Sequence, residues 1–382
     1  MDFTFTSEQK LLRDSIVKFA RGELNHDVIE RDRAQTFSRE LWRQCAAVGL
    51  LGLPVPEEYG GSGADPLSCA IALEALGYGC CDGGLVFSIC AHVLACVVPV
   101  WQHGSAAQKD RYLRGLCDGT LVGAHAITEP DSGSDTFAMR LRAERAGSGW
   151  RLNGSKTFIS NGPVADVVVL FAVTDPDKGF HGGVTGFLVE RGVAGFSSGQ
   201  KFAKMGLRTS PVGELVFQDV LVPDEAVLGA VGGGASVFGT AMDWERSLLV
   251  AAHVGTIERL LETSITYART RSQFGQTIGK FQAVAHKIAD MKVQLEAARL
   301  LVYRTASRLT TTRSISLDAA ITKLFVSESL VRASLDAVQL HGGYGFMEEY
   351  EVERALRDAI GSTLYSGASE MQRNIIGRWL GL

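Results

Sequence analysis

The segment Thr240-Ala-Met-Asp-Trp-Glu-Arg-Ser-Leu-Leu249 places one carboxylate within an apolar helical stripe. On a helix, Glu245 lies three residues before Leu248, so its side chain projects from the face that packs against a core. Burial of an unpaired charge is costly, so this carboxylate is expected to have a raised pKa and a chemical role. In the structural alternative, Glu245 lies at the edge of the stripe and reaches solvent or pairs with Arg246 or Arg259.

The chain that follows this segment predicts long helices. Apolar residues spaced by threes and fours predict a helix from residue 281 to about 309 that packs in a bundle. A further helix is expected over about 317–340, where Gly342-Gly343 ends it. We therefore predict a C-terminal four-helix bundle at residues 231–382.

The preceding sequence predicts a helical domain at residues 1–120 and a β domain at residues 121–230, which makes the fold class α+β. Thr6 and Gln9 form a capping box ahead of the first apolar helix. Branched and aromatic residues predict strands at 167–173, 184–189 and 214–222. Asn153-Gly154, between two short β-like runs, predicts a hairpin turn.

Composition excludes several classes of protein. The 382 residues carry a net charge of -4 without a basic cluster, which argues against nucleic-acid binding. The seven cysteines lie in the first third without metal-ligand spacing and predict reduced core thiols and no metal site. Residues 84–101 lack charged side chains but contain His92 and Pro99, so we expect a buried helix and no membrane span. With no signal peptide expected, a cytoplasmic protein is predicted.

Six segments coincide in order and spacing with those of a known family. They are residues 126–135 (AITEPDSGSD), 153–162 (NGSKTFISNG), 204–208 (KMGLR), 271–275 (RSQFG) followed by Gln282, 339–343 (QLHGG) and 364–372 (LYSGASEMQ). Each motif alone is a weak signal, but six in register are highly specific. Over essentially its whole length, the chain resembles the acyl-CoA dehydrogenase family.

The resemblance implies a flavoprotein that removes two hydrogens across the α,β bond of an acyl thioester. It implies a helical N-terminal domain, a middle β-barrel domain and a C-terminal bundle, with FAD between the last two. Members are commonly homotetramers that pass electrons to an electron-transferring flavoprotein. A bacterial enzyme of this kind is expected.

Matching positions assign the FAD contacts. Ile127, Thr128, Phe158 and Ser160 are implied to flank the isoalloxazine ring. The resemblance implies that the pyrophosphate and adenylate end of FAD is bound by Arg271, Phe274 and Gln282, together with Gln339, Gly342 and Gly343 of a neighbouring subunit. An arginine can bind a pyrophosphate bidentately, and paired glycines let backbone approach a phosphate. By residue type alone, Arg271 is also compatible with a surface cation, the glycines with a helix stop and Phe158 with β-domain core.

Matching positions also assign contacts to the pantetheine arm or its carrier. These are Ser134, Asp243 and Arg246, together with Ser366 and Gly367 of the late loop. The alternatives are a turn serine at position 134 and a solvated ion pair between Asp243 and Arg246.

The expected base is displaced from its usual position. Most relatives carry a Glu directly after the Tyr of a late Tyr-Glu-Gly-Thr motif, and here Ser366 occupies that place. A minority, the isovaleryl and long-chain type enzymes, carry the base on the first bundle helix at the position of Glu245. We therefore expect Glu245 to take the α-proton while the β-hydrogen leaves as hydride to flavin N5.

Two further departures affect the cofactor. Ala368 and Glu370 replace a threonine and a glutamine that normally help to bind FAD. Ala368 lacks the hydroxyl, and Glu370 places a negative charge near a pyrophosphate, so weaker or rearranged FAD contacts are expected.

The acyl group remains open at this stage. Ser366, the helix at 243–246 and the segment 84–87 are more similar to dehydrogenases of secondary metabolism, such as antibiotic biosynthesis, that act on prolyl and other groups held by a carrier protein. CoA and a carrier protein present the same pantetheine arm. Two other functions stay possible: a flavin oxidase or monooxygenase on this fold, and a non-catalytic binder of acyl thioesters.

Overall fold

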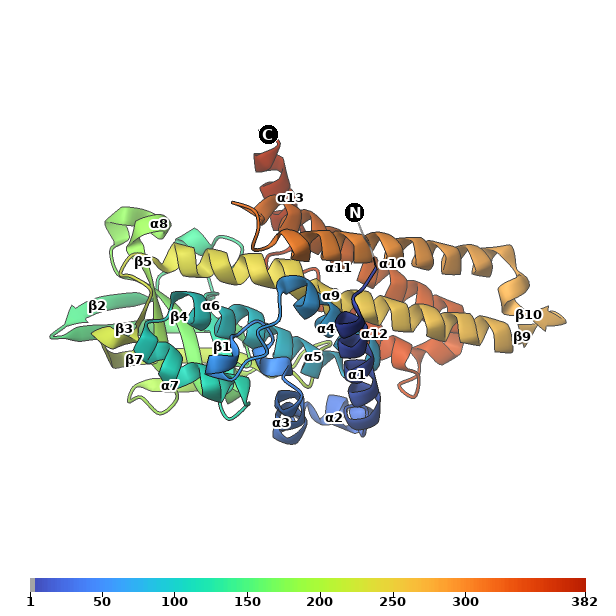
Figure 1. Ribbon diagram of the computed structural model, residues 1–382, viewed down its shortest axis with the longest axis horizontal. Helices are drawn as coiled ribbons and strands as arrows, with labels where there is room; N and C mark the ends of the chain where they lie inside the picture. The colour runs from blue at the N-terminus through green and yellow to red at the C-terminus, as the bar shows by residue number, and fades with distance from the viewer. Residues whose placement is uncertain (1–3) are drawn as a thin grey trace.

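The computed structural model describes residues 4–382 and arranges them in the predicted order α, β, α (Figure 1). The capping box is present: the Gln9 N–H donates to Thr6 Oγ1, and the Thr6 N–H donates to Gln9 Oε1. The helices of this first part are α1 (Ser7–Glu23), α2 (Val28–Ala34), α3 (Arg39–Ala47), α4 (Pro66–Gly79), α5 (Gly83–His92), α6 (Val98–His103) and α7 (Ala106–Cys117).

The apolar run in this part is a core helix of the fold. A π-helical turn, Val93–Val97, joins α5 to α6. By length and composition Gly83–His103 could cross a membrane, but 94% of its apolar window is buried inside the protein. The seven cysteines are free, and all but Cys81 are buried. Both observations agree with the predicted buried helix and core thiols.

The middle part is a mixed β-sheet with strand order β6-β7-β3-β2-β4-β5-β8, and β1 pairs with β4. Its strands are β1 (Gly123–Ala126), β2 (Arg142–Ala146), β3 (Gly149–Ser160), β4 (Val167–Val173), β5 (Val184–Glu190), β6 (Phe196–Lys201), β7 (Val212–Pro223) and β8 (Val227–Leu228), with the short helix α8 (Gly179–Gly183) before β5. The three strands predicted from branched residues are confirmed as β4, β5 and β7.

The hairpin predicted at Asn153-Gly154 is wrong. Both residues lie inside β3, and the turn between β2 and β3 falls at residues 147–148. The pairing of β3 with β7 shifts between Leu152 and Gly154, so the Asn-Gly pair marks a β-bulge. Asn153 closes this bulge through its side chain, which accepts from the Asp219 N–H at 2.8 Å. An Asn-Gly pair fits a bulge as well as a turn, because Asn and Gly adopt positive φ more readily than other residues and both structures can require it.

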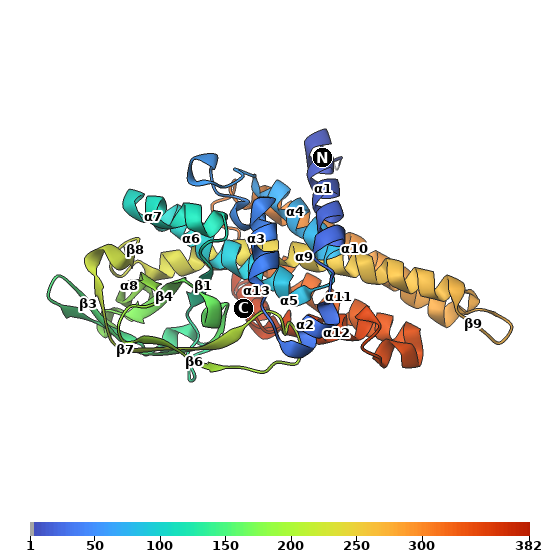
Figure 2. The ribbon, with the colours of Figure 1, turned by 90° about the horizontal axis from the view of Figure 1, so that it is seen from below.

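The C-terminal part consists of α9 (Gly234–Thr270), α10 (Gln282–Arg308), α11 (Ser316–His341), α12 (Glu351–Gly361) and α13 (Ser369–Trp379). The small hairpin of β9 (Ser272–Gln273) and β10 (Gln276–Thr277) follows α9. Figures 1 and 2 show α9 running from the β domain to this hairpin, about 55 Å at 1.5 Å per residue. Leu248 and Leu249 of α9 belong to the same hydrophobic core as Leu73 of α4 and Ile89 of α5. The helix that carries Glu245 therefore joins both helical parts.

Candidate active site

A cavity of about 740 Å³ lies where α5, α9, the β domain and the late loop before α13 meet. This volume is within the range of small-molecule and cofactor sites. Of the predicted residues, the cavity wall brings together Ile127, Thr128, Ser134, Phe158, Ser160, Glu245, Arg246, Ser366, Gly367 and Ala368. Segments distant in the sequence thus converge on one site, as the resemblance implied.

Glu245 is a buried carboxylate in this wall, and only 7% of its surface is exposed. The solvent-facing alternative is therefore wrong. Among the described residues Glu245 also forms no ion pair with Arg246 or Arg259, since Arg246 binds the Ser366 carbonyl and Arg259 pairs with Glu351 at 2.5 Å. Burial raises the pKa of Glu245 to about 7, against the opposing effects of the Ser366 hydroxyl, Arg246 and Lys323. A group with this pKa can take and release a proton near neutral pH.

The late loop is fixed through its backbone. Ser366 has φ of 55°, a left-handed conformation that is unusual for a residue with a side chain. Its carbonyl accepts from Arg246 Nε at 2.9 Å, and the next carbonyl, of Gly367, accepts from Lys323 Nζ and Gln372 Nε2, both at 2.8 Å. The Ser366 Oγ is buried next to Glu245, and its hydroxyl favours the ionised form of that carboxylate. These contacts hold the Ser366 side chain beside Glu245.

Lys323 and Gln372 were not found from the sequence. Lys323 is 1% exposed, and burial lowers its pKa to about 8. A lysine inside the apolar repeat of a bundle helix is the signal that could have pointed to it, because buried lysines need a partner. The partner is a backbone carbonyl on another segment, and no sequence pattern shows that.

Of the predicted contacts to the pantetheine arm, only Asp243 lies outside the cavity wall. Arg246 lines the cavity, but its hydrogen bond goes to Ser366, and no ion pair with Asp243 exists among the described residues. The solvated ion-pair alternative is therefore wrong. Asp243 is half-buried outside the cavity wall, and burial raises its pKa. Ser134 is exposed on the loop between β1 and β2 and lines the cavity.

The β-domain wall of the cavity fits a flat aromatic group. Phe158 is 65% exposed with φ of 56°, so the core alternative is wrong, and its ring lines this face of the cavity. A buried pair braces the strands beneath: Lys156 Nζ donates to the Ile127 carbonyl at 2.9 Å and to Glu129 Oε1 at 2.8 Å. Thr128 and Ser160 add polar atoms beside this face. The residues present thus suit a planar ring with hydrogen-bonding edges, such as isoalloxazine.

A second set of predicted residues lies at the far end of α9. Arg271, Gly342 and Gly343 line an open pocket of about 450 Å³, where the Arg271 guanidinium lies over the Tyr344 ring at 5.6 Å. Phe274 is 92% exposed, and Gln282 and Gln339 are exposed as well. Arg271 follows Glu245 by 26 residues, or about 39 Å along the helix. One chain therefore does not bring this set to its own cavity.

The two altered positions of the late motif lie on either side of the helix start. Ala368 is the N-cap of α13 and lines the cavity, whereas Glu370 is exposed in the first turn of that helix.

The fold and this cavity define the class of protein. Residues 6–120, 124–220 and 232–381 match the N-terminal, middle and C-terminal domains of acyl-CoA dehydrogenases. The chain belongs to the acyl-CoA dehydrogenase family. It is a FAD-dependent oxidoreductase that dehydrogenates acyl thioesters.

Among individual proteins, the chain is 42% identical to an L-prolyl-peptidyl-carrier-protein dehydrogenase of Serratia sp. (strain ATCC 39006), over 100% of this chain and 99% of that one. It is 40% identical to a short-chain acyl-CoA dehydrogenase of Megasphaera elsdenii, over 99% of each. Solved structures include the prolyl acyl carrier protein oxidase AnaB, with a TM-score of 0.97, 42% identity and coverage of 99% and 100%. PigA with FAD and proline also has a TM-score of 0.97, with 41% identity and full coverage of both chains.

Proposed function

We propose that this enzyme oxidises the Cα–Cβ bond of a prolyl group held as a thioester on a carrier protein, with Glu245 as the base. The observation that carries the proposal is a buried carboxylate on α9 beside a late-loop serine that cannot act as a carboxylate. The names of the Serratia relative and of the AnaB and PigA structures support the prolyl group. A solvent-facing Glu245 would favour the non-catalytic alternative, and the Glu245 side chain is buried.

In this proposal the residues of the chain bind the thioester and move one proton. The Glu245 carboxylate takes the proton from the carbon next to the thioester carbonyl, and the electrons of that C–H bond form the double bond. Bound FAD supplies the acceptor for the β-hydrogen and its electron pair. Lys323 and Arg246 lie near Glu245 and favour its ionised form before proton transfer. Aromatic and apolar side chains keep water away from Glu245. This desolvation holds the pKa of Glu245 near neutrality.

We further propose that Arg271, Gly342 and Gly343 of one subunit complete the FAD site of another. This accounts for their separation from the cavity of their own chain and requires at least a dimer, with the tetramer as the expected form. An electron-transferring flavoprotein is the proposed acceptor, and the bacterial cytoplasm is the proposed location, since the relatives named above are bacterial.

The test mixes the purified yellow protein, without oxygen, with prolyl thioester on a carrier protein and, separately, with prolyl-CoA and butyryl-CoA. Bleaching of the flavin at least tenfold faster by the carrier-bound prolyl group supports the proposal. Faster bleaching by butyryl-CoA would instead place the enzyme in acyl catabolism.

An oxidase is the second candidate, because the AnaB structure carries that description. Oxygen consumption during turnover, in the absence of any electron carrier and with stoichiometric peroxide formation, would favour it. A requirement for an added electron-transferring flavoprotein would favour the dehydrogenase.

A further inference from the structure

A second, smaller cavity of about 40 Å³ adjoins the main one and is called the rear cavity below. It is large enough to hold water. Four residues line both cavities and so form a common wall: Phe87, Leu207, Asp358 and Tyr365. The rest of the rear cavity includes apolar residues such as Leu249, Leu330 and Ala355 and polar ones such as His253 and Thr256.

Three of the four wall residues are tied by polar contacts. The Tyr365 hydroxyl lies 2.9 Å from Nε2 of His253, which reaches it through the rear cavity. Asp358 accepts a hydrogen bond from the Leu207 N–H, and Leu207 itself has φ of 51°. Phe87 has no polar group in its side chain, and it is held by ring packing on Tyr365, with 4.5 Å between ring centroids. Phe87 is therefore the member that can be truncated without loss of a hydrogen bond.

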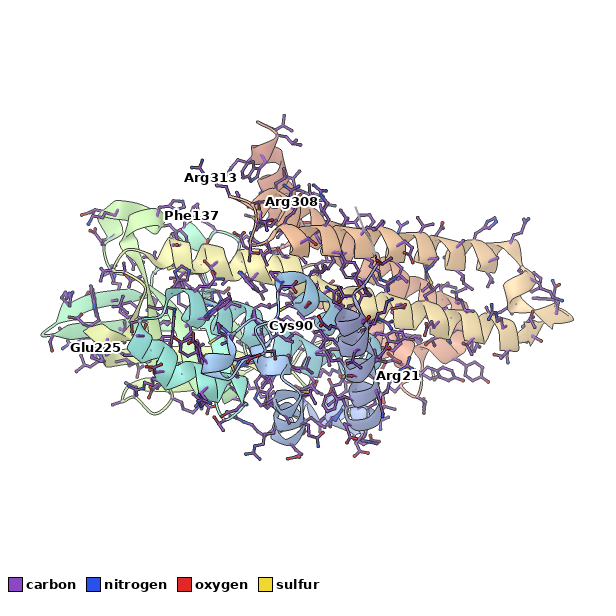
Figure 3. All side chains as sticks on the ribbon, in the orientation of Figure 1. Arg21, Cys90, Phe137, Glu225, Arg308 and Arg313 are labelled. Atoms are coloured by element: carbon purple, nitrogen blue, oxygen red, sulfur yellow. The ribbon has the colours of Figure 1, made fainter. Side chains whose placement is uncertain are left out.

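The wall stands next to the base. Phe87 lies one helical turn before Cys90, which Figure 3 shows in the middle of the molecule. Phe87 and Ala91 of this part of α5 line the main cavity together with Glu245, so the three side chains border the same space. Tyr365 directly precedes the late-loop residue beside Glu245. An acyl group bound in this cavity with its α-carbon at Glu245 shares the space with the Phe87 and Tyr365 rings.

We propose that Phe87 sets the depth of the acyl site, so that the enzyme accepts a compact acyl group such as a five-membered ring and rejects longer straight chains. Tyr365 and His253 hold the ring of Phe87 in place from behind. The wall separates the rear cavity from the acyl site, so the substrate does not enter that volume. This inference rests on the proposed thioester dehydrogenation and concerns the acyl end of the same site.

The experiment compares the wild-type protein with Phe87→Ala on butyryl, hexanoyl and octanoyl thioesters, each loaded on CoA and on a carrier protein. Two quantities are measured: kcat/KM for flavin bleaching, and the Kd of unreactive S-alkyl thioether analogues from the shift in flavin absorbance. In Phe87→Ala, the octanoyl-to-butyryl ratio of both quantities should rise at least about tenfold, because each newly buried methylene contributes roughly fourfold. An unchanged ratio in a folded, yellow variant would overturn the inference.

Two further variants make the result specific. Ala355→Val in the Phe87→Ala background refills the rear cavity and should remove most of the gain for octanoyl groups. Phe238 also lines the main cavity, next to His125 and apart from the rear cavity. Phe238→Ala therefore deletes the same kind of ring elsewhere and should leave the chain-length ratio within about twofold, whatever its effect on the rate. If Phe87→Ala does not fold, Phe87→Leu should show a smaller change in the same direction, and no change there would equally overturn the inference.

This experiment separates the inference from the proposed function. If the wild-type protein does not oxidise prolyl thioesters but the Phe87 variants still gain long-chain substrates, the proposed substrate is wrong and the role of Phe87 stands. If prolyl thioesters are oxidised and the Phe87 variants gain nothing, only the role of Phe87 is wrong.

Discussion

Replacing Glu245 by glutamine should lower activity and raise stability at the same time. Glutamine keeps the shape of the side chain but cannot accept the α-proton. A positioned general base contributes typically about 10²- to 10⁴-fold. The rate of flavin bleaching by a saturating thioester should therefore fall by about that factor.

The stability of Glu245→Gln should depend on pH in a predictable direction. The pKa of Glu245 rises from an ordinary 4.5 to about 7 in the fold. The protonated acid is thus favoured in the folded state, and this contribution is fully present below pH 4.5 and lost as pH rises through 7. At pH 8 the buried carboxylate costs about 3 kcal/mol relative to the acid. Glutamine does not titrate, so the variant should gain up to about 3 kcal/mol over the wild-type protein between pH 4.5 and 8.

Two measurements on the same samples test this reasoning. Rapid mixing without oxygen gives the bleaching rate, and urea unfolding at pH 5 and pH 8 gives the change in the free energy of unfolding. Adding Ser366→Glu to the variant offers a control, since it returns a carboxylate to the usual position and should recover part of the rate. A bleaching rate within a few-fold of wild type would refute the role of Glu245 as base. A variant less stable than wild type at pH 8 would refute the conclusion that the buried Glu245 carboxylate destabilises the fold at that pH.

Three other perturbations have definite expected outcomes. Lys323→Met removes a cation near Glu245, so the pKa of Glu245 should rise and the acid limb of the bleaching rate should move to higher pH by up to about one pH unit. Gly367→Ala places a methyl at φ of +87°, 2.8 Å from Gln372 Nε2, and should destabilise the fold by about 1–3 kcal/mol in thermal unfolding. Arg271→Ala should lower the FAD retained per subunit, measured as the ratio of flavin to protein absorbance, while the octanoyl-to-butyryl ratio stays unchanged.

The order of the elements could be predicted from local patterns. Spacing by threes and fours gave α10 and α11 to within a few residues, and branched residues gave β4, β5 and β7, because these signals depend only on which face is buried. The failure at Asn153-Gly154 has a different origin. Whether an Asn-Gly pair forms a turn or a bulge depends on how its strand pairs with β7. This register is set by residues distant in the sequence.

The site was predictable only where a chemical need shows in one segment. Glu245 stood out because a carboxylate in an apolar stripe is anomalous on its own. Lys323, His253 and the wall at Phe87 did not stand out, because their meaning depends on partners on other elements. The position of Arg271 was implied by resemblance, and no residue pattern indicates that it lies far from the cavity of its own chain.

The contacts of the late loop explain how a base can leave this loop without loss of the site. The fold holds the loop by the carbonyls of Ser366 and Gly367, through Arg246, Lys323 and Gln372. None of these bonds involves the side chain at position 366, so a serine there keeps the backbone and leaves room beside it. A carboxylate on α9 can then occupy that space, and the same cations that fix the loop favour its ionised form. The position of the base is thus free to move between two elements, provided that the carbonyl contacts of the loop are kept.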